Sequence, residues 1–455
     1  MKGKLMPHEL DKILISLSER DSDEKIVELL QAIVRATIFL SNDQRREELE
    51  RIFQDVIDNG DKAIAKYTKK FDDVDLTPEQ FRVSTEDLEK AHKEIEENNP
   101  ELLASIRRAI VNVREYQKEI FTGHDIPGKV RYTPIQRVGI CVPGASAPLP
   151  SSVIMTAVPA QVAGVKEIVV VSPPRYKGSI HPVILAVCHE LQIDEEYKDC
   201  CIETYRIGGA QAVAALASGT SKIGKVYKIV GPGNQWVQMA KHRAFGVVDI
   251  DSVAGPSEVL IIANDKANPA WVAADMLSQA EHNPGCAFLF TDSQEFANEV
   301  LAKLKKQVGE LGRSEETIKC LETYSKIVVF DNMKEIIKGA NDIAPEHLEV
   351  QCGSESRMIA ERVWDAGAIF IGEYSPVAVG DYWAGPSHTL PTGRTAKFFS
   401  ALSANDFIKS TSIIEYDQKK LAESADDIIR LAEVEGLDAH AKSIKIRQSP
   451  LKNDS

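Results

Sequence analysis

Apolar and polar residues follow two different periods along this chain of 455 residues. In the first part, apolar side chains recur every three or four positions, which predicts helices over 8–38 and 43–119 with breaks at Gly60 and Gly123. From about residue 130 onward, short apolar runs alternate with helical stretches. That alternation is typical of βαβ units with a mostly parallel sheet.

The short apolar runs form two groups of predicted strands. The first group covers 137–142, 167–171 and 225–230, with helices over 153–162, over 180–191 and from about 234. The second group covers 259–263, 287–291, 326–330 and 367–371, with helices between them. From residue 400 the pattern predicts helix as far as Gly436, followed by a short strand over 443–447. The continuous apolar run at 167–171 is typical of a parallel strand that is buried on both faces.

Composition narrows the class of protein. With 43% hydrophobic and 27% charged residues, the chain has the composition of a soluble globular protein. A formal net charge of −14 without a basic stripe argues against nucleic-acid binding. No apolar run reaches the about 18 residues that a membrane span needs, and no apolar signal core follows Met1. A cytoplasmic protein without membrane contact is therefore predicted.

The cysteines limit the kind of metal site that the chain can form. Seven are scattered along the sequence without a CxxC pair, which is typical of reduced thiols in a cytoplasm-like compartment. They are Cys141, Cys188, Cys200, Cys201, Cys286, Cys320 and Cys352. Any metal must therefore be held by histidine, carboxylate and amide ligands.

One candidate for such ligands lies at the end of a predicted helix over 271–282. Gln279 and His282 are three residues apart and share a helix face, whereas Glu281 points away from it. Asn-Pro-Gly at 283–285 stops the helix and leaves His282 at an exposed end. An amide oxygen and an imidazole at this spacing are half of a first-row metal site, and a polar helix end has the same pattern.

Three glycine-containing loops lie next to predicted helices, at 142–152, 207–212 and 231–234. Glycines before a helix let backbone N–H groups approach an anion, and ligands bind at the carboxyl ends of strands in open α/β sheets. A complete G-x-G-x-x-G motif is absent after residue 231, because Trp236 stands at the third glycine position. The loops therefore fit either a nucleotide pocket or ordinary helix starts.

Carboxylates and histidines also stand together in three later segments. Glu346 and His347 are adjacent in a predicted loop or helix start, where they can do acid–base chemistry or form an ordinary surface. In the segment 380–393, Asp381 can bind a metal, and His388 can do so or be structural. The run 435–440 places a glutamate and a histidine around a helix-ending glycine, where a surface histidine is also common.

Taken in order, these segments resemble the histidinol dehydrogenase family, whose members catalyse the last two oxidations of histidine biosynthesis. The resemblance spans about residues 56–447, and its motifs are long, specific and in the family's order. The matching runs are 142–144, 208–211, 231–234, 254–259, 278–282, 344–349, 380–393 and 435–440.

The resemblance implies zinc and NAD as cofactors and oxidation of L-histidinol through L-histidinal to L-histidine. The implied zinc ligands are Gln279, His282, Asp381 and His440. The implied substrate contacts are Ser257, Gln279, His282, His347, Asp381, Glu435 and His440. His347 is expected to take the alcohol proton, and Glu346 to activate the water that hydrates the aldehyde. The implied NAD contacts are Gln211, Asn234 and Cys141, the last at a position where the family has a tyrosine.

The expected fold class is α/β, with two α/β domains that contain incomplete Rossmann-like parallel sheets, plus small N-terminal helical and C-terminal segments. The family resemblance also implies a homodimer in which Glu435 and His440 complete the partner's site. The predicted division is 1–40 for an N-terminal helical segment, 41–138 with 259–399 for a discontinuous first domain, 139–258 for the NAD-binding domain, and 400–455 for the C-terminal segment.

Two alternatives remain at this point. A paralogue can oxidise another small alcohol, such as a sulfonated diol, although 256–258 and 278–279 favour the histidinol form. A catalytically silent metal-binding scaffold is the other alternative, and Cys141 in place of tyrosine is its only support.

Overall fold

The computed structural model describes residues 7–17, 43–144, 148–282 and 285–448. These residues form two compact units. The first unit comprises Met1–Thr122 and Pro134–Ile408, and the second comprises Gly123–Thr133 and Lys409–Ser455. No helix in the described ranges is long and apolar enough to cross a membrane.

The first unit contains a five-stranded parallel sheet in the order β5-β4-β3-β6-β7. Its strands are β3 (Arg137–Cys141), β4 (Glu167–Val171), β5 (Cys201–Tyr205), β6 (Lys228–Val230) and β7 (Asp249–Ile250). The chain adds strands on one side of β3 and then continues on the other side with β6. Such a reversal opens a crevice at the carboxyl ends of the two strands.

Helices cover both faces of this sheet, as the apolar run at β4 predicts. Ile168 and Val170 pack into one core, and Val169 and Val171 pack into the other. The helices involved are α2 (Asp43–Asn59), α3 (Asp61–Asp72), α4 (Thr85–Asn98), α5 (Pro100–Glu119), α6 (Pro150–Val162), α7 (Pro182–Gln192), α8 (Gly209–Ser218) and α9 (Gln235–Ala244). The predicted breaks at Gly60 and after α5 are confirmed.

The packing of α2–α5 differs from the predicted grouping of 41–138 with 259–399. Leu49 and Ile64 are buried in the core of the five-stranded sheet, and so are Leu88 and Ile106. The helical period of these segments identifies which side chains are buried but carries no information about which sheet buries them.

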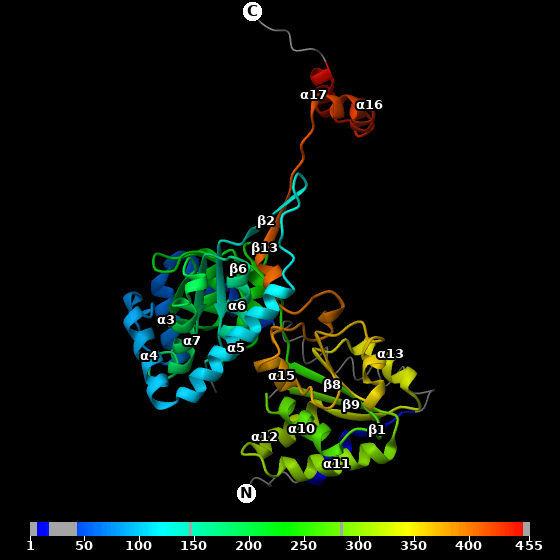
Figure 1. The fold of residues 1–455 in the computed structure, drawn as a ribbon. Helices are drawn as coiled ribbons and strands as arrows, with labels where there is room; N and C mark the ends of the chain where they lie inside the picture. The colour runs from blue at the N-terminus through cyan, green and yellow to red at the C-terminus, as the bar shows by residue number, and fades with distance from the viewer. Residues whose placement is uncertain (1–6, 18–42, 145–147, 283–284, 449–455) are drawn as a thin grey trace, which may run out of the picture. The chain divides into compact units, whose positions relative to one another are not determined.

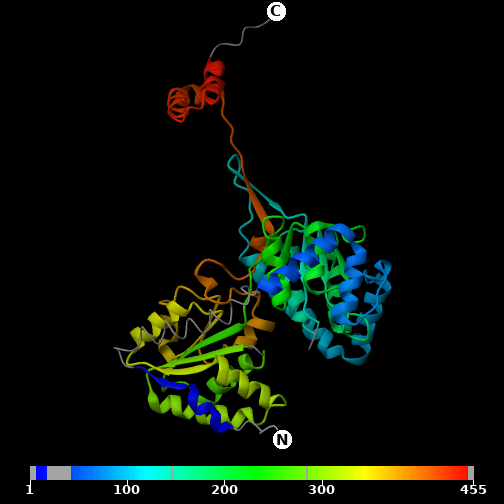
Figure 2. The same ribbon diagram turned by 180° about the vertical axis from the view of Figure 1, so that it is seen from behind.

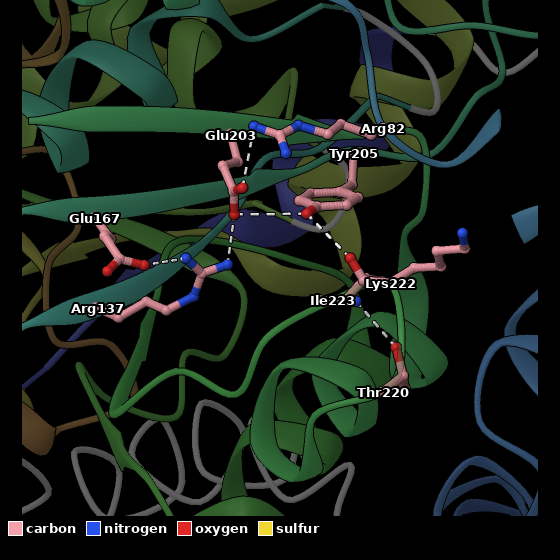
Figure 3. Close-up of polar contacts among 8 residues, drawn as sticks. All are labelled: Arg82, Arg137, Glu167, Glu203, Tyr205, Thr220, Lys222 and Ile223. Atoms are coloured by element: carbon pink, nitrogen blue, oxygen red, sulfur yellow. Dashed lines mark hydrogen bonds and ion pairs between the residues drawn. The ribbon is translucent and has the colours of Figure 1, made fainter. Parts of the chain in front are cut away.

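A charged network ties the amino ends of the same sheet together (Figure 3). Arg137, the first residue of β3, pairs with Glu167 at the start of β4 and donates to Glu203 of β5 at 2.5 Å. Arg82 lies 3.0 Å from the other oxygen of Glu203. This network is structural, and it leaves the carboxyl ends of the strands to the loops that line the pockets.

The second sheet of the first unit has six parallel strands in the order β1-β10-β9-β8-β11-β12. They are β1 (Leu14–Ser16), β8 (Ser257–Ala263), β9 (Gly285–Thr291), β10 (Lys326–Val329), β11 (His347–Gln351) and β12 (Ala368–Ile371). One face carries α10 (Pro269–Ala280), α11 (Gln294–Val308) and α12 (Ser314–Tyr324), and the other carries α13 (Met333–Ile343) and α14 (Ser356–Ala360). Figures 1 and 2 show this layering from opposite sides. A short helix, α15 (Val377–Tyr382), follows β12.

The N-terminal prediction is wrong where the structure describes it. Pro7–Ile13 forms a 3-10 helix, and the chain then enters the sheet as β1, in register with β10 from Leu14 to Ser16. The rest of the helix predicted over 8–38 falls on 18–38, which lies outside the described residues.

The second unit contains a two-stranded sheet and two helices. The strands are β2 (Val130–Pro134) and β13 (Ile408–Ser412), and the helices are α16 (Gln418–Val434) and α17 (Asp438–Gln448). The helix predicted from residue 400 to Gly436 is confirmed only over α16, because a 3-10 turn and β13 occupy 404–412. The strand predicted over 443–447 is wrong because α17 continues through it. Ala441 and Ile444 pack with Ile429 of α16, which favours helix over strand there.

Candidate functional site

A first pocket of about 300 Å³ lies at the carboxyl ends of β3, β4 and β6. Its wall includes all three predicted NAD contacts, which are Cys141, Gln211 and Asn234. The three glycine loops also contribute, through 142–144, 208–209 and 232–233. A pocket therefore lies at the carboxyl ends of these strands, where ligands bind in open α/β sheets.

The side chains of this pocket fit a polar cofactor. Both polar atoms of the Gln211 amide are buried and have no hydrogen-bond partner among the described residues, which suits them to bind a ligand. Gly209 has φ +71°, which favours glycine, and a Cβ there would lie 2.8 Å from the Gln211 amide oxygen and would displace the amide. Asn234 caps α9 by accepting from the N–H groups of Trp236 and Val237. Burial raises the pKa of Cys141 to about 12, so it presents a neutral thiol.

A second cavity of about 230 Å³ adjoins the first pocket, because Pro232 and Gly233 line both. It contains Ser257 at the start of β8, His347 at the start of β11, and Glu346 just before it. The six-stranded sheet thus contributes the amino ends of its strands, in contrast to the five-stranded sheet. Gln279, His282 and Asp381 complete the set of predicted residues in this wall.

His347 is held in one tautomer by its neighbours. Its Nδ1 lies 3.0 Å from the carbonyl oxygen of Glu258, to which it donates, so Nε2 is left as an acceptor. Nε2 is buried, has no hydrogen-bond partner among the residues that the structure describes, and lies 3.8 Å from Oδ1 of Asp381. Burial lowers the pKa of His347 to about 4, so the imidazole is neutral near pH 7. A buried neutral imidazole with a free Nε2 at a cavity wall is suited to accept a proton.

Glu346 is buried beside this imidazole, with Oε2 3.5 Å from Nδ1 of His347. The same Oε2 accepts the backbone N–H of Glu258 at 2.8 Å. Burial raises the pKa of Glu346 well above its ordinary range, and the negative charges of Glu258 and Asp381 raise it further. A carboxyl group with a raised pKa can exchange protons near pH 7.

Glu346 and His347 lie at a strand start, whereas the sequence predicted a loop or a helix start. Strand geometry places successive side chains on opposite faces. The bend at Glu346 lets both reach the cavity before regular strand pairing begins at His347.

Three of the four predicted metal ligands line the cavity wall. Gln279 is 1% exposed in the last turn of α10, and its Nε2 has no hydrogen-bond partner in the part of the chain that the structure describes. His282 is exposed after the helix, as predicted. Burial raises the pKa of Asp381 to about 6, and His282 lowers it. One amide, one imidazole and one carboxylate fit a first-row metal such as zinc. Across the described part of the chain, no three His, Cys, Asp or Glu side chains gather into a metal cluster.

The remaining two predicted residues belong to the second unit. Glu435 follows α16 and His440 lies in α17, and both are exposed. Every described residue of the cavity wall comes from the first unit.

The structure adds two cavity residues that the sequence left undecided or missed. His388 lines the wall with its Nε2 3.3 Å from Oγ of Ser151, and burial lowers its pKa to about 4. Lys241 is buried beneath the shared loop, where it forms an ion pair with Asp251. A lysine on the helical stretch after 234 gives no sequence signal of burial, because most lysines are exposed.

Comparison with known proteins agrees with this geometry. The sequence model of the family described as histidinol dehydrogenase matches residues 38–448. A histidinol dehydrogenase of Rhodopirellula baltica is 46% identical over 408 residues, which are 88% of this chain and 86% of the relative. One of Caldanaerobacter subterraneus subsp. tengcongensis is 45% identical over 416 residues, 90% of this chain and 94% of the relative. The crystal structure of histidinol dehydrogenase from Elizabethkingia anophelis has a TM-score of 0.81 and 35% identity, covering 90% of this chain and 93% of that chain. The chain therefore belongs to the histidinol dehydrogenase family, which are oxidoreductases of histidine biosynthesis.

Proposed function

We propose that this chain oxidises L-histidinol to L-histidine in two NAD-dependent steps with zinc in the second cavity. The single observation that carries the proposal is the wall shared by the two pockets. Pro232 and Gly233 separate a pocket with an unpaired Gln211 amide from a cavity with a neutral His347 imidazole. A nicotinamide ring that passes this loop from the first pocket would meet a substrate in the second.

Gln279, His282 and Asp381 would hold the metal, and NAD would occupy the pocket lined by Gln211 and Asn234. Bound zinc supplies a Lewis acid that fixes the substrate, and bound NAD supplies the hydride acceptor. Ser257 lines the same cavity and contributes a hydroxyl for substrate hydrogen bonding.

In the first oxidation, Nε2 of His347 takes the alcohol proton while the carbon-bound hydrogen leaves as hydride. The products are the aldehyde and NADH. The Nδ1–H bond to Glu258 keeps the imidazole oriented and stabilises the imidazolium that forms.

In the second oxidation, Glu346 accepts a proton from the water that adds to the aldehyde carbon. The hydrate then loses hydride to a second NAD and gives the carboxylic acid. The raised pKa of Glu346 makes its carboxylate a stronger base than an ordinary glutamate.

We further propose a homodimer in which Glu435 and His440 of the partner subunit complete each site. The support is that three of the four expected metal ligands line the cavity, while Glu435 and His440 are exposed in the second unit. Catalysis in the cytoplasm is the corresponding expectation for location.

The direct test is product formation by zinc-loaded protein supplied with L-histidinol and NAD. L-Histidine and NADH should both appear, and their formation should stop after chelation and resume when zinc is restored. Formation of neither product by protein that demonstrably binds zinc would contradict the proposed activity.

A further inference from the structure

Beneath the second cavity lies a cluster of polar side chains that does not line it. Glu349 is wholly buried, Gln351 is 2% exposed, and Asp275 is partly buried. Nε2 of Gln351 donates to Oδ2 of Asp275 at 2.8 Å and to Oε2 of Glu349 at 3.0 Å. Two carboxyl groups and one amide thus meet in the interior. Burying such groups costs free energy, so packing alone does not explain the cluster.

The cluster also reaches a third element. Oε1 of Glu349 accepts the backbone N–H of Val377, the first residue of α15, at 2.9 Å. The first helical N–H groups have no partner within their own helix, so this bond satisfies one that would otherwise be unpaired. Glu349 therefore fixes where α15 begins.

Each member of the cluster lies close in sequence to a residue of the proposed site. Asp275 stands four residues, about one turn, before Gln279 in α10. Glu349 stands two residues after His347, so the two side chains share a face of β11. Val377 stands four residues before Asp381 in α15. The cluster thus joins the three elements that supply the amide ligand, the base and the carboxylate ligand.

The two carboxyl groups also interact directly. Burial raises the pKa of Glu349 well above its ordinary range, and the nearby charge of Asp275 raises it further. Burial raises the pKa of Asp275 as well, and a hydrogen bond between the two side chains adds to the rise at Glu349 and opposes the rise at Asp275. The Gln351 amide and the Val377 N–H supply donors that offset the burial of these groups.

We infer that Glu349, together with Asp275 and Gln351, is a positioning group that sets the distance between Asp381 and the Gln279–His282 helix end for metal binding. This inference rests on the proposed zinc site. Outer partners that orient ligands commonly change metal affinity by about 10- to 100-fold when they are removed. The cluster acts through α10 and α15, because its residues do not touch the cavity themselves.

The test compares zinc affinity, measured by chelator competition, with thermal unfolding of the metal-free protein. Glu349→Ala should weaken zinc binding by about 10- to 100-fold and change the visible absorption of the Co²⁺-substituted protein. Glu349→Gln should bind within about threefold of wild type, because its amide oxygen still accepts from Val377 and its NH2 still donates to Asp275, with only the bond from Gln351 lost. Asp275→Ala should also weaken binding, and its partial exposure makes it the variant of choice if Glu349→Ala does not fold.

Asp61→Ala is the matched control. Asp61 is a buried carboxylate in α3 that accepts from Thr220 at 2.6 Å and also bonds to Ser221, next to the five-stranded sheet. Its loss should lower the unfolding temperature and leave zinc affinity unchanged.

Three results would overturn the inference. Wild-type zinc affinity in both Glu349→Ala and Asp275→Ala would make the cluster purely structural. Equal weakening by Glu349→Gln and Glu349→Ala would contradict the hydrogen-bonding account. Failure of the wild-type protein to bind zinc would overturn the proposed function and this inference with it. The first two results would overturn this inference alone.

Discussion

Two properties of the buried imidazole of His347 suit it to act as a base. Its tautomer is set by the Glu258 carbonyl at 3.0 Å, and its Nε2 is unpaired at the cavity wall. Glu346, one residue earlier, shares the same environment but has its pKa shifted upward instead. Burial disfavours the charged form of each group, so it lowers the pKa of the histidine and raises the pKa of the glutamate.

The two roles predict different kinetic defects. His347→Asn should slow the first oxidation by about 10²- to 10⁴-fold, because the amide cannot accept the alcohol proton. Glu346→Gln should leave that step nearly intact and slow oxidation of added L-histidinal. Stopped-flow measurement of NADH with each substrate checks this, and the reverse pattern would refute the assignment of roles.

Glu258 provides a pH-dependent prediction. Burial raises its pKa to about 7 from 4.5, and the N–H groups of Gly393 and Arg394 offset this only in part. The folded protein therefore holds a proton that the unfolded chain releases above pH 4.5, so this residue's contribution to stability is lost as pH rises toward 7.

Glu258→Gln is uncharged at every pH. Its free energy of unfolding, relative to wild type, should therefore rise by on the order of 3 kcal/mol as the pH increases from below the unfolded pKa to above the folded one. Urea unfolding of both proteins at several pH values measures this difference. A difference that does not change with pH would show that Glu258 titrates normally.

Single residues were also the most predictable part of the site. Family motifs predict four residues that line one cavity in the structure, namely Ser257, Gln279, His282 and Asp381. The cluster around Glu349 is not predicted from the sequence, although His347, Glu349 and Gln351 alternate with the period of a strand. The proline before Glu346 favours a loop or helix start, and this hides the period of the strand.

At the scale of elements, the loop 231–233 is the part on which both pockets depend. Gly231 donates its N–H to Oδ2 of Asp251 at 2.7 Å and accepts from Nζ of Lys241 at 3.0 Å. The buried ion pair of Lys241 and Asp251 therefore binds both the backbone N–H and the carbonyl oxygen of Gly231. A Cβ at Gly231, where φ is +105°, would lie 2.4 Å from the carbonyl oxygen of Cys141. The loop packs this closely on β3 only because residue 231 is glycine.

Removing the lysine should loosen this loop. We expect Lys241→Met combined with Asp251→Asn to raise the KM for NAD about tenfold, as expected for loss of a charge-assisted hydrogen bond. The double substitution avoids a lone buried charge, so the protein should stay folded. Steady-state kinetics with NAD and histidinol varied separately measures the effect. Because the loop lines both pockets, the KM for histidinol should rise as well, and unchanged KM values for both ligands would contradict a role of the ion pair in holding the loop.

Element prediction failed where local pattern and packing disagree. Strand β1 lies inside a segment with helical spacing, and its three residues pair with β10 because a sheet edge is available there. The alternating run 443–447 has the period of a strand, but Ala441 and Ile444 pack on α16 as a helix. In both places long-range contacts decide the structure, and a short window of sequence does not contain them.

At the scale of the whole molecule, two parallel sheets with opposite ends facing the pockets account for the site. The five-stranded sheet supplies the carboxyl ends of its strands, and the six-stranded sheet supplies the amino ends of β8 and β11. Alternating strands and helices predict β3, β4 and β6 of one sheet and β8, β9, β10 and β12 of the other, but not β1, β5, β7 or β11. No local pattern gives the strand order or the packing of α2–α5.

The proposed sharing of sites between subunits predicts complementation. His347→Asn and His440→Asn should each be inactive alone, whereas subunits remixed from the two should regain about a quarter of wild-type activity. In a mixed dimer one site carries both substitutions and the other carries neither. Activity after unfolding and refolding of the mixture is the measurement, and absence of recovery in proven mixed dimers would contradict shared sites.

The most direct test of the central claim is the number of NADH molecules formed per L-histidinol consumed. With limiting L-histidinol, excess NAD and zinc-loaded protein, the account predicts two NADH for each L-histidinol and L-histidine as the product. One NADH per L-histidinol with free aldehyde in solution, or no NADH at all, would contradict it.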